Sequence, residues 1–353
     1  MATKIVPKDE MRSFIERVMT KLGVVQSHAK SLADLLVAGD YRGHFSHGLN
    51  RLEIYMKDVQ EKTCKTDGTP VVLKETAATA WVDGNNLLGP VTGKFCMQLA
   101  IEKAKQSGIG WVVSKGCNHF GIAGYYSMMA LQHKLLGMAF TNASPLTIAT
   151  RGKEPFFGTN PISLSAPGNG DDSFVLDMAT SVVALGKVEL AARKQESIPD
   201  NWVIDSNGNS STDPNKFNAL YPLGGEESSS GYKGYGLATL VEIITSVLGG
   251  GAVAPNVRNW TQNSSMADLG QCFIAINPEC FAPGFQDRMQ GLMDNLRSQE
   301  PSKPGVNVMV HGDPERAHME KCDRLGGIEY HINQIKMANE IAVRLNIEPV
   351  KTL

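Results

Sequence analysis

The sequence predicts a mixed α/β (α+β) fold, with a helical part built from both chain ends beside a part that contains a sheet. Apolar residues recur at helical spacing near the N-terminus, short apolar runs alternate with helical segments from about residue 70, and helices return at the C-terminus. At 353 residues the chain can form two domains. We expect a mainly helical domain from residues 1–70 with 286–353, and a sheet-containing domain from residues 71–285.

Helices are predicted for most of residues 8–60. The first apolar stripe ends at Gly23 and consists of Met11, Phe14, Ile15, Val18, Met19 and Leu22. Ser27 is placed to cap a second helix. A third helix is expected around residues 49–59, where Leu49, Leu52, Met56 and Val59 recur.

The middle of the chain predicts alternating strands and helices. Pro90 is suited to begin a helix that Gly108 ends. Strands are expected at residues 78–82, 109–113, 137–141, 174–178, 272–276 and 306–310. Further helices are expected at residues 125–131, 181–194, 237–248 and 285–296, with two more before the C-terminus. Turn residues dominate residues 199–231, which predicts loops there.

Composition argues against several classes of function. The formal net charge is -2, from 34 basic and 36 acidic residues with no basic block, so nucleic acid is not an expected partner. No apolar run approaches the roughly 18 residues of a membrane span. The six cysteines form no C-x-x-C pair, which indicates reduced thiols rather than a disulfide framework or a zinc site. The first residues lack an apolar signal segment, so we expect a cytoplasmic protein.

Residues 40–51 concentrate groups suited to acid/base chemistry. They include His44, Ser46, His47 and Arg51, in a protein with only eight histidines. Histidine titrates nearest neutral pH, an adjacent serine can share a proton with it, and arginine can bind a carboxylate at two points. The segment falls between two predicted helices, where side chains can point into a cleft. It is therefore a candidate site for proton transfer on a small acid.

Four other features are ambiguous from the residues alone. The Rossmann pattern G-x-G-x-x-G is absent, but residues 231–236 open a helix where backbone amides and Lys233 could meet a phosphate, or merely form a tight turn. His119, in a glycine-rich loop, either meets a ligand or caps a helix. Asp177, after a predicted strand, either caps a helix or orients a histidine. Residues 157–161 read as a turn.

Taken together, these segments resemble the malate/L-lactate dehydrogenase type 2 family, which also includes sulfolactate, ureidoglycolate and diketogulonate enzymes and a ketimine reductase. The matching blocks follow the family order over about residues 8 to 345. They are residues 42–48 with Arg51 and Tyr55, then 118–121, 158–161, 177–181 and 231–236. The resemblance implies a non-Rossmann nicotinamide-binding fold, in which residues 71–285 bind the nucleotide, and a homodimer with active sites near the subunit interface.

The resemblance also implies which residues meet the cofactor, NAD or NADP, of which NAD is the preferred choice. These residues are His119, Gly121, Ser144, Asp177, Met178, Ala179, Thr180 and Lys233. A further cofactor segment of the family aligns with Gly312, Asp313 and Pro314, although His311 stands where the family has proline. No metal ion is expected.

The expected reaction is hydride transfer between NAD(P) and a small 2-hydroxy or 2-oxo acid, malate- or lactate-like. Oxidation of such an acid requires a base, a carboxylate anchor and a fixed nicotinamide. We assign His47 as the acid/base group, Ser46 as its hydrogen-bond relay and Asp177 as the group that holds His47. Arg51 is the expected carboxylate anchor, and His119 contacts nicotinamide or substrate or is itself the acid/base group. The other expected substrate-binding residues are Thr159 and Asn160.

Three alternatives remain open at this stage. An imine or ketimine reductase would use the same hydride chemistry on a C=N bond. A metal-dependent lyase or hydrolase would use His44, His47 and His119, although the H-E-x-x-H motif is absent. A non-catalytic binding protein could retain the fold without the reaction.

Overall fold

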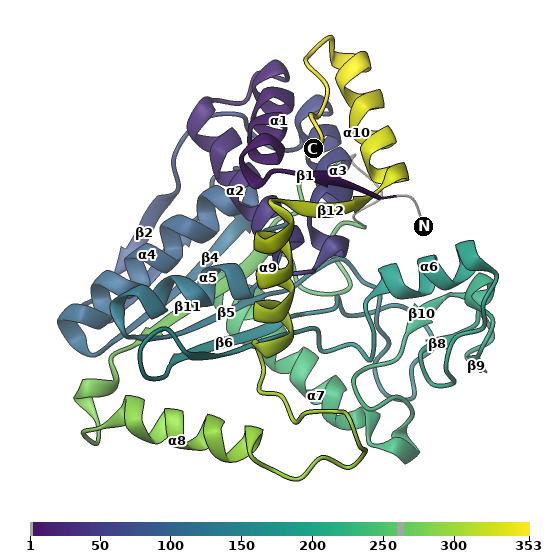
Figure 1. Ribbon diagram of the computed structural model, residues 1–353. Helices are drawn as coiled ribbons and strands as arrows, with labels where there is room; N and C mark the ends of the chain where they lie inside the picture. Colours follow the sequence, from purple (N-terminus) through teal and green to yellow (C-terminus); the bar gives the residue numbers. More distant parts are fainter. Residues whose placement is uncertain (1–2, 260–264) are drawn as a thin grey trace.

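The computed structural model describes residues 3–259 and 265–353, and a seven-stranded mixed sheet lies at its centre (Figure 1). The strand order is β2-β3-β4-β11-β5-β6-β7. Only β3 and β4 pair in parallel, and the other neighbours are antiparallel. The strands are β2 (Val71–Glu75), β3 (Thr79–Asp83), β4 (Ile109–Cys117), β5 (Leu136–Thr141), β6 (Ile162–Pro167), β7 (Ser173–Met178) and β11 (Leu269–Ile276). This confirms the predicted mixed α/β class.

Helices cover both faces of the central strands. The helices α4 (Gly89–Ser107) and α5 (Gly124–Ser127) pack on one face, against residues such as Val112 and Phe273. On the other face, α7 (Gly231–Glu242) and the π-helical turn η6 (Ile243–Val247) cover Val113 and Cys272. Neighbouring residues of one strand thus enter different cores, as the period-two geometry of a strand requires.

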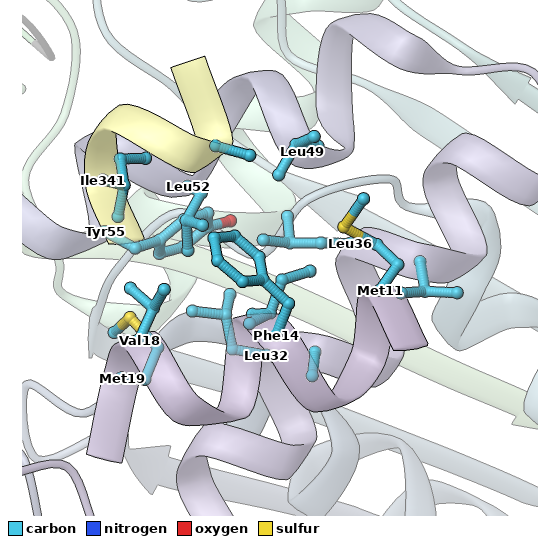
Figure 2. Packing of buried hydrophobic residues seen from close by; sticks show 14 of the residues in the cluster. Met11, Phe14, Val18, Met19, Leu32, Leu36, Leu49, Leu52, Tyr55 and Ile341 are labelled. Carbon is cyan, nitrogen blue, oxygen red and sulfur yellow. The ribbon is translucent and has the colours of Figure 1, made fainter. Parts of the chain in front are cut away.

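The two chain ends form one helical region, which extends from the top of Figure 1 to its centre. Its helices are α1 (Lys8–Lys21), α2 (Gln26–Tyr41), α3 (Leu52–Gln60), α9 (Asp313–Leu325) and α10 (Ile332–Leu345). The strands β1 (Thr3–Val6) and β12 (Ile328–His331) pair antiparallel and tie the ends together. A single buried cluster joins α1, α2 and α3 to α10, as Phe14, Leu32, Tyr55 and Ile341 illustrate in Figure 2. The exact division into two domains remains a prediction.

A smaller unit lies to the right in Figure 1. It contains α6 (Leu185–Lys194) and a three-stranded sheet of order β10-β8-β9, with strands Ala219–Leu220, Val203–Ile204 and Ser210–Ser211. Val188, Val203 and Leu220 belong to its buried cluster. Loops were expected over most of this stretch, because strands of two residues leave no periodic signal.

Several predicted boundaries are wrong. Residues 306–310 form no strand, because they find no pairing partner and the chain turns there into α9, with the Val310 amide donating to Asp313. Ser27 does not cap α2, which follows Val25 instead. The helix expected from residue 181 begins only at Leu185. The strands β2 and β6 were not anticipated.

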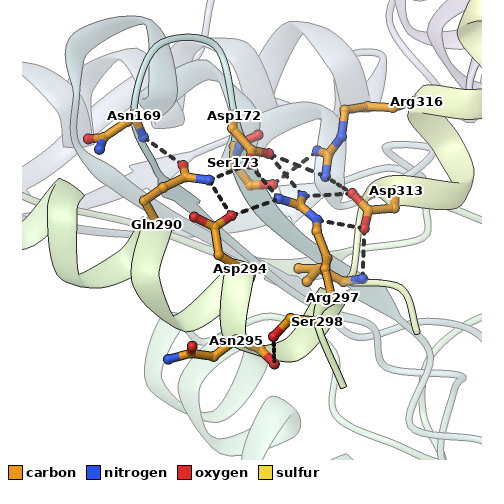
Figure 3. A network of polar contacts seen from close by, with 11 residues as sticks. Asn169, Asp172, Ser173, Gln290, Asp294, Asn295, Arg297, Ser298, Asp313 and Arg316 are labelled. Carbon is orange, nitrogen blue, oxygen red and sulfur yellow. Dashed lines mark hydrogen bonds and ion pairs between the residues drawn. The ribbon is translucent and has the colours of Figure 1, made fainter. Parts of the chain in front are cut away.

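Charged side chains bind α8 (Phe285–Arg297) to the turn between β6 and β7 and to the start of α9 (Figure 3). Arg297 donates to Asp172, in the turn between β6 and β7, at 2.6 Å and to Asp313, at the start of α9, at 2.8 Å. Arg316 also pairs with Asp313. Hydrogen bonds from Arg297 hold the pKa of Asp172 at about 2 and that of Asp313 well below its usual range.

Among the described residues, no helix is long and apolar enough to cross a membrane.

Candidate active site

A cavity of about 270 Å³ lies where the helical region meets strand ends of the main sheet. Its walls come from residues within 44–58, 119–123, 143–146, 159–161, 177–179, 184–186 and 267–269, together with Arg258. The stretches that follow β4, β5 and β7 reach it from the sheet, and the first turn of α6 reaches it from the smaller unit. The cavity therefore collects side chains that are far apart in sequence.

The junction between α2 and α3 presents the histidine cluster to this cavity. It consists of two short 3₁₀ turns, η1 (Phe45–His47) and η2 (Leu49–Arg51), separated by Gly48. Fully buried Asp40 anchors this junction, because its Oδ2 accepts from the Leu49 amide at 2.9 Å and from the Tyr330 hydroxyl at 2.8 Å. A Cβ atom at position 48 would overlap the Asp40 carboxylate, so only glycine fits there.

His47 and Ser46 form the expected pair. Ser46 Oγ lies 2.9 Å from His47 Nδ1, and Arg51 Nε donates to the Ser46 carbonyl at 2.6 Å. Burial, together with the nearby His119 and Arg51, lowers the pKa of His47 to about 3. The imidazole is therefore neutral at physiological pH and able to accept a proton.

His119 faces the same cavity from the loop after β4. Its ring lies almost parallel to that of His47, with centroids 6.0 Å apart and an interplanar angle of 16°. The Tyr55 hydroxyl lies 2.7 Å from His119 Nδ1, and the Gly121 amide donates to the same nitrogen at 3.4 Å. Burial, with a contribution from Arg51, lowers the pKa of His119 to about 4, so this ring is neutral as well.

Asp177 lines the cavity but does not hold His47. Its Oδ2 accepts from the Gly124 amide at 2.8 Å, at the start of α5, and no hydrogen bond to His47 is present within the described chain. The expected pairing is therefore absent from this structure, because the first residue of α5 binds the carboxylate. Burial raises the pKa of Asp177 to about 6. Asp177 does not cap the helix that follows it either, since α6 begins only at Leu185; it binds the first residue of α5 instead.

Five of the other predicted residues also lie at the cavity. Besides Ser46, His47, His119, Arg51 and Asp177, the lining includes Gly121, Ser144, Thr159, Met178 and Ala179. Fully buried Asn160 does not line it, since its side chain bonds to Ala238 and Glu242. Thr180 is also buried, and its hydroxyl donates to the carbonyls of Thr159 and Asn160. These two residues support the cavity wall from behind.

The remaining predicted cofactor residues lie away from the cavity lining. Lys233 is exposed in the first turn of α7. Gly312 precedes α9 with a φ of 103°, Pro314 lies in the first turn of that helix, and Asp313 is bound by two arginines. Their cofactor roles remain predictions.

Sequence reasoning missed an ion pair in the cavity wall. Arg258 and Asp58 both line the cavity, with an Arg258 Nη2 to Asp58 Oδ1 distance of 2.9 Å and side-chain exposures of 8% and 6%. Arg258 also donates to the Ser265 carbonyl at 2.7 Å. The pair joins α3 to the segment before β11. No local pattern could have revealed it, because about 200 residues separate the partners.

No cluster of metal ligands is present in the part of the chain that the structure describes. Within residues 3–259 and 265–353, no three or more histidine, cysteine, aspartate or glutamate side chains are grouped to hold a metal ion. His44 instead faces Glu315, with His44 Nε2 and Glu315 Oε1 3.6 Å apart.

Comparison with known proteins identifies close relatives over nearly the whole chain. The family described as malate/L-lactate dehydrogenase matches residues 6–337. A malate dehydrogenase of Pyrococcus horikoshii is 40% identical over 97% of this chain and 96% of its own length. A malate/(S)-sulfolactate dehydrogenase of Methanothermus fervidus is 38% identical over 98% of this chain and 99% of its own. The crystal structure of a malate dehydrogenase from Entamoeba histolytica superposes with a TM-score of 0.92 at 32% identity, covering 98% and 99% of the two chains.

Proposed function

The chain belongs to the malate/L-lactate dehydrogenase family, and on that premise we propose that its cavity is where a hydride passes between a nicotinamide cofactor and a small 2-hydroxy acid. The protein is an oxidoreductase that acts on a CH–OH group. The observation that carries the assignment to the cavity is the convergence of His47 with Ser46, His119 and Arg51 on one enclosed space. These residues supply the proton carrier and the carboxylate anchor that the reaction needs.

The cavity suits a nicotinamide ring, which when bound supplies the hydride donor or acceptor. Small apolar residues such as Ala143 and Ala179 line it beside the polar groups, which leaves room for a flat ring. Gly121, Ser144, Asp177 and Met178 would hold the cofactor. We propose NAD as the preferred nucleotide and NADP as the alternative.

His47 is the proposed acid/base group. In the oxidation direction its neutral imidazole accepts the hydroxyl proton, while Ser46 Oγ holds Nδ1. Arg51 binds the carboxylate of the substrate, and that negative charge offsets one of the causes that lower the pKa of His47. The same groups can serve an imine, because a C=N bond needs a hydride and a proton in the same places.

A binding and activity screen tests this function. Titration of NADH and NADPH after chelation, followed by nicotinamide fluorescence, should show binding of a nicotinamide without metal. Oxidation of the reduced cofactor should then be compared for pyruvate, oxaloacetate and a cyclic imino acid. Failure of both nucleotides to bind would refute the proposal, and a preference for the imino acid would make the chain an imine reductase.

We also propose a homodimer that works in the cytoplasm. Exposed apolar side chains on α7, η6 and the following residue support an interface, since Leu240, Ile243, Val247 and Leu248 are 44–60% exposed. All six cysteines are free thiols, which suits a reducing compartment. Light scattering should give the dimer mass, and a fully active monomer would contradict the assembly.

A further inference from the structure

We infer that Tyr55 is a positioning residue that locks His119 in the tautomer with its proton on Nε2, so that His119 donates a hydrogen bond into the cavity and leaves proton transfer to His47. The tautomer follows from contacts within the chain alone. Its catalytic meaning rests on the proposed dehydrogenase function.

The Tyr55 hydroxyl is held in place by the core of the helical region. Its side chain is 2% exposed and packs in the cluster that includes Leu52 and Ile341 (Figure 2). This packing holds α3 and the Tyr55 ring in place. Its hydroxyl remains 2.7 Å from His119 Nδ1.

The contacts at His119 Nδ1 decide where the ring proton lies. A backbone amide can only donate, so the Gly121 amide at 3.4 Å requires Nδ1 to be an acceptor. The Tyr55 hydroxyl must then also donate to Nδ1. A neutral imidazole carries one ring proton, which therefore lies on Nε2. Burial supports this assignment, since it lowers the pKa of His119 to about 4 and raises that of Tyr55, so that the tyrosine keeps its proton.

A locked Nε2–H limits what His119 can do. It can donate a hydrogen bond to the carbonyl or alkoxide oxygen of a substrate, but it has no free lone pair with which to accept the hydroxyl proton. It thus acts as a fixed electrostatic stabiliser of developing negative charge.

His47 has no such lock. Its Nδ1 partner is the Ser46 hydroxyl, which can either donate or accept. When Nδ1–H donates to Ser46, His47 Nε2 is free to take the substrate proton, and both nitrogens carry protons afterwards. The two stacked histidines therefore have different roles because a tyrosine contacts one and a serine the other.

Nuclear magnetic resonance of the full-length protein with ¹⁵N-labelled histidine tests the tautomer directly. Long-range ¹H–¹⁵N correlations distinguish a protonated ring nitrogen from an unprotonated one, and loss of the signals in H119N assigns them. We expect Nδ1 of His119 to be unprotonated and Nε2 protonated near neutral pH. In Tyr55→Phe only the longer 3.4 Å contact from the Gly121 amide still favours an acceptor at Nδ1, so the tautomers should mix. The kcat should fall roughly 10-fold or more, with nucleotide Kd unchanged, because one stabilising donor is no longer fixed.

Tyr126→Phe is the matched control. Tyr126 is fully buried, and its hydroxyl donates to the carbonyl of Phe120, next to His119, at 2.6 Å. This variant loses a comparable hydrogen bond without touching the imidazole, so the His119 tautomer should not change and kcat should stay within about 2-fold.

Three results would overturn the inference. They are a proton on Nδ1 of His119 in the wild type, an unchanged tautomer in Y55F, or a kcat in Y55F equal to that of Y126F. If Y55F fails to fold, the wild-type spectrum alone decides. Absence of nucleotide binding with the expected tautomer would instead refute the dehydrogenase proposal, so the two failures are distinguishable.

Discussion

Replacing Arg258 with methionine should destabilise the protein by leaving the Asp58 charge in the cavity wall without its nearest cation. The two side chains are 8% and 6% exposed, and their shortest distance is 2.9 Å. Removing one partner of a buried ion pair costs about 3–5 kcal/mol. We expect about 3 kcal/mol, the lower end of that range, because the Thr63 hydroxyl still donates to Asp58 Oδ1 at 3.1 Å.

Urea unfolding followed by tryptophan fluorescence measures this loss, provided that the m-value stays constant. The double variant D58N/R258M removes both charges and should regain at least half of the stability. Arg344→Met is the matched surface control, since its pair with Glu53 has a similar distance of 3.1 Å but side-chain exposures of 58% and 41%. It should change stability by less than about 1 kcal/mol.

Two outcomes would refute this reasoning. If R258M were no less stable than R344M, the buried pair would carry no net energy. If the double variant were as unstable as R258M, lost packing rather than the loss of the Arg258 charge beside Asp58 would be the cause.

Four further predictions concern the catalytic groups and the junction that presents them. His47→Asn should cut turnover by roughly 10²- to 10⁴-fold while nicotinamide binding persists. If His119→Asn lost more turnover than His47→Asn, His119 rather than His47 would be the acid/base group. Arg51→Lys should mainly raise KM for the 2-oxo acid in steady-state assays, since an ammonium cannot make a bidentate contact. Asp177→Asn should reduce kcat less than His47→Asn, because Asp177 contacts the Gly124 amide and not the imidazole. Burial raises the pKa of Asp40 to about 7, so between pH 4 and 7 the folded protein keeps a proton there that the unfolded chain releases near pH 4. The urea midpoint of the wild type should therefore fall as pH rises from about 4 to 7, and that of Asp40→Asn should fall less.

Local signals in the sequence were reliable where neighbouring residues decide the structure. Helical spacing predicted α1 and α3, and Pro90 with Gly108 correctly bounded α4, in which Gly108 adopts the left-handed conformation of a helix C-cap. The pair Ser46–His47 and the proposed carboxylate anchor Arg51 lie within one short segment, so their proximity needed no knowledge of the fold. The edge strand β2 was not predicted, because all five of its residues are exposed and it shows no alternation of buried and exposed positions.

Contacts between distant residues could not be predicted in this way. Asp40 meets Tyr330 across 290 positions, Tyr55 meets His119 across 64, and Asp58 meets Arg258 across 200. Such pairs form because helices from both chain ends pack together and bring the α2–α3 junction against the sheet. A single sequence carries no distance information of that kind.

The sequence by itself therefore determined the family and the reaction class, and it located the segment that holds the proposed acid/base pair, because these follow from residue types at short, fixed spacings. Only the tertiary structure decided which charges are available at the cavity. It directs Asp313 to Arg297 and Arg316, turns Asp177 toward the Gly124 amide and sets Tyr55 against His119. The physical reason is that a polar group buried on folding must find a partner, and the packing of distant elements determines which partner lies within reach.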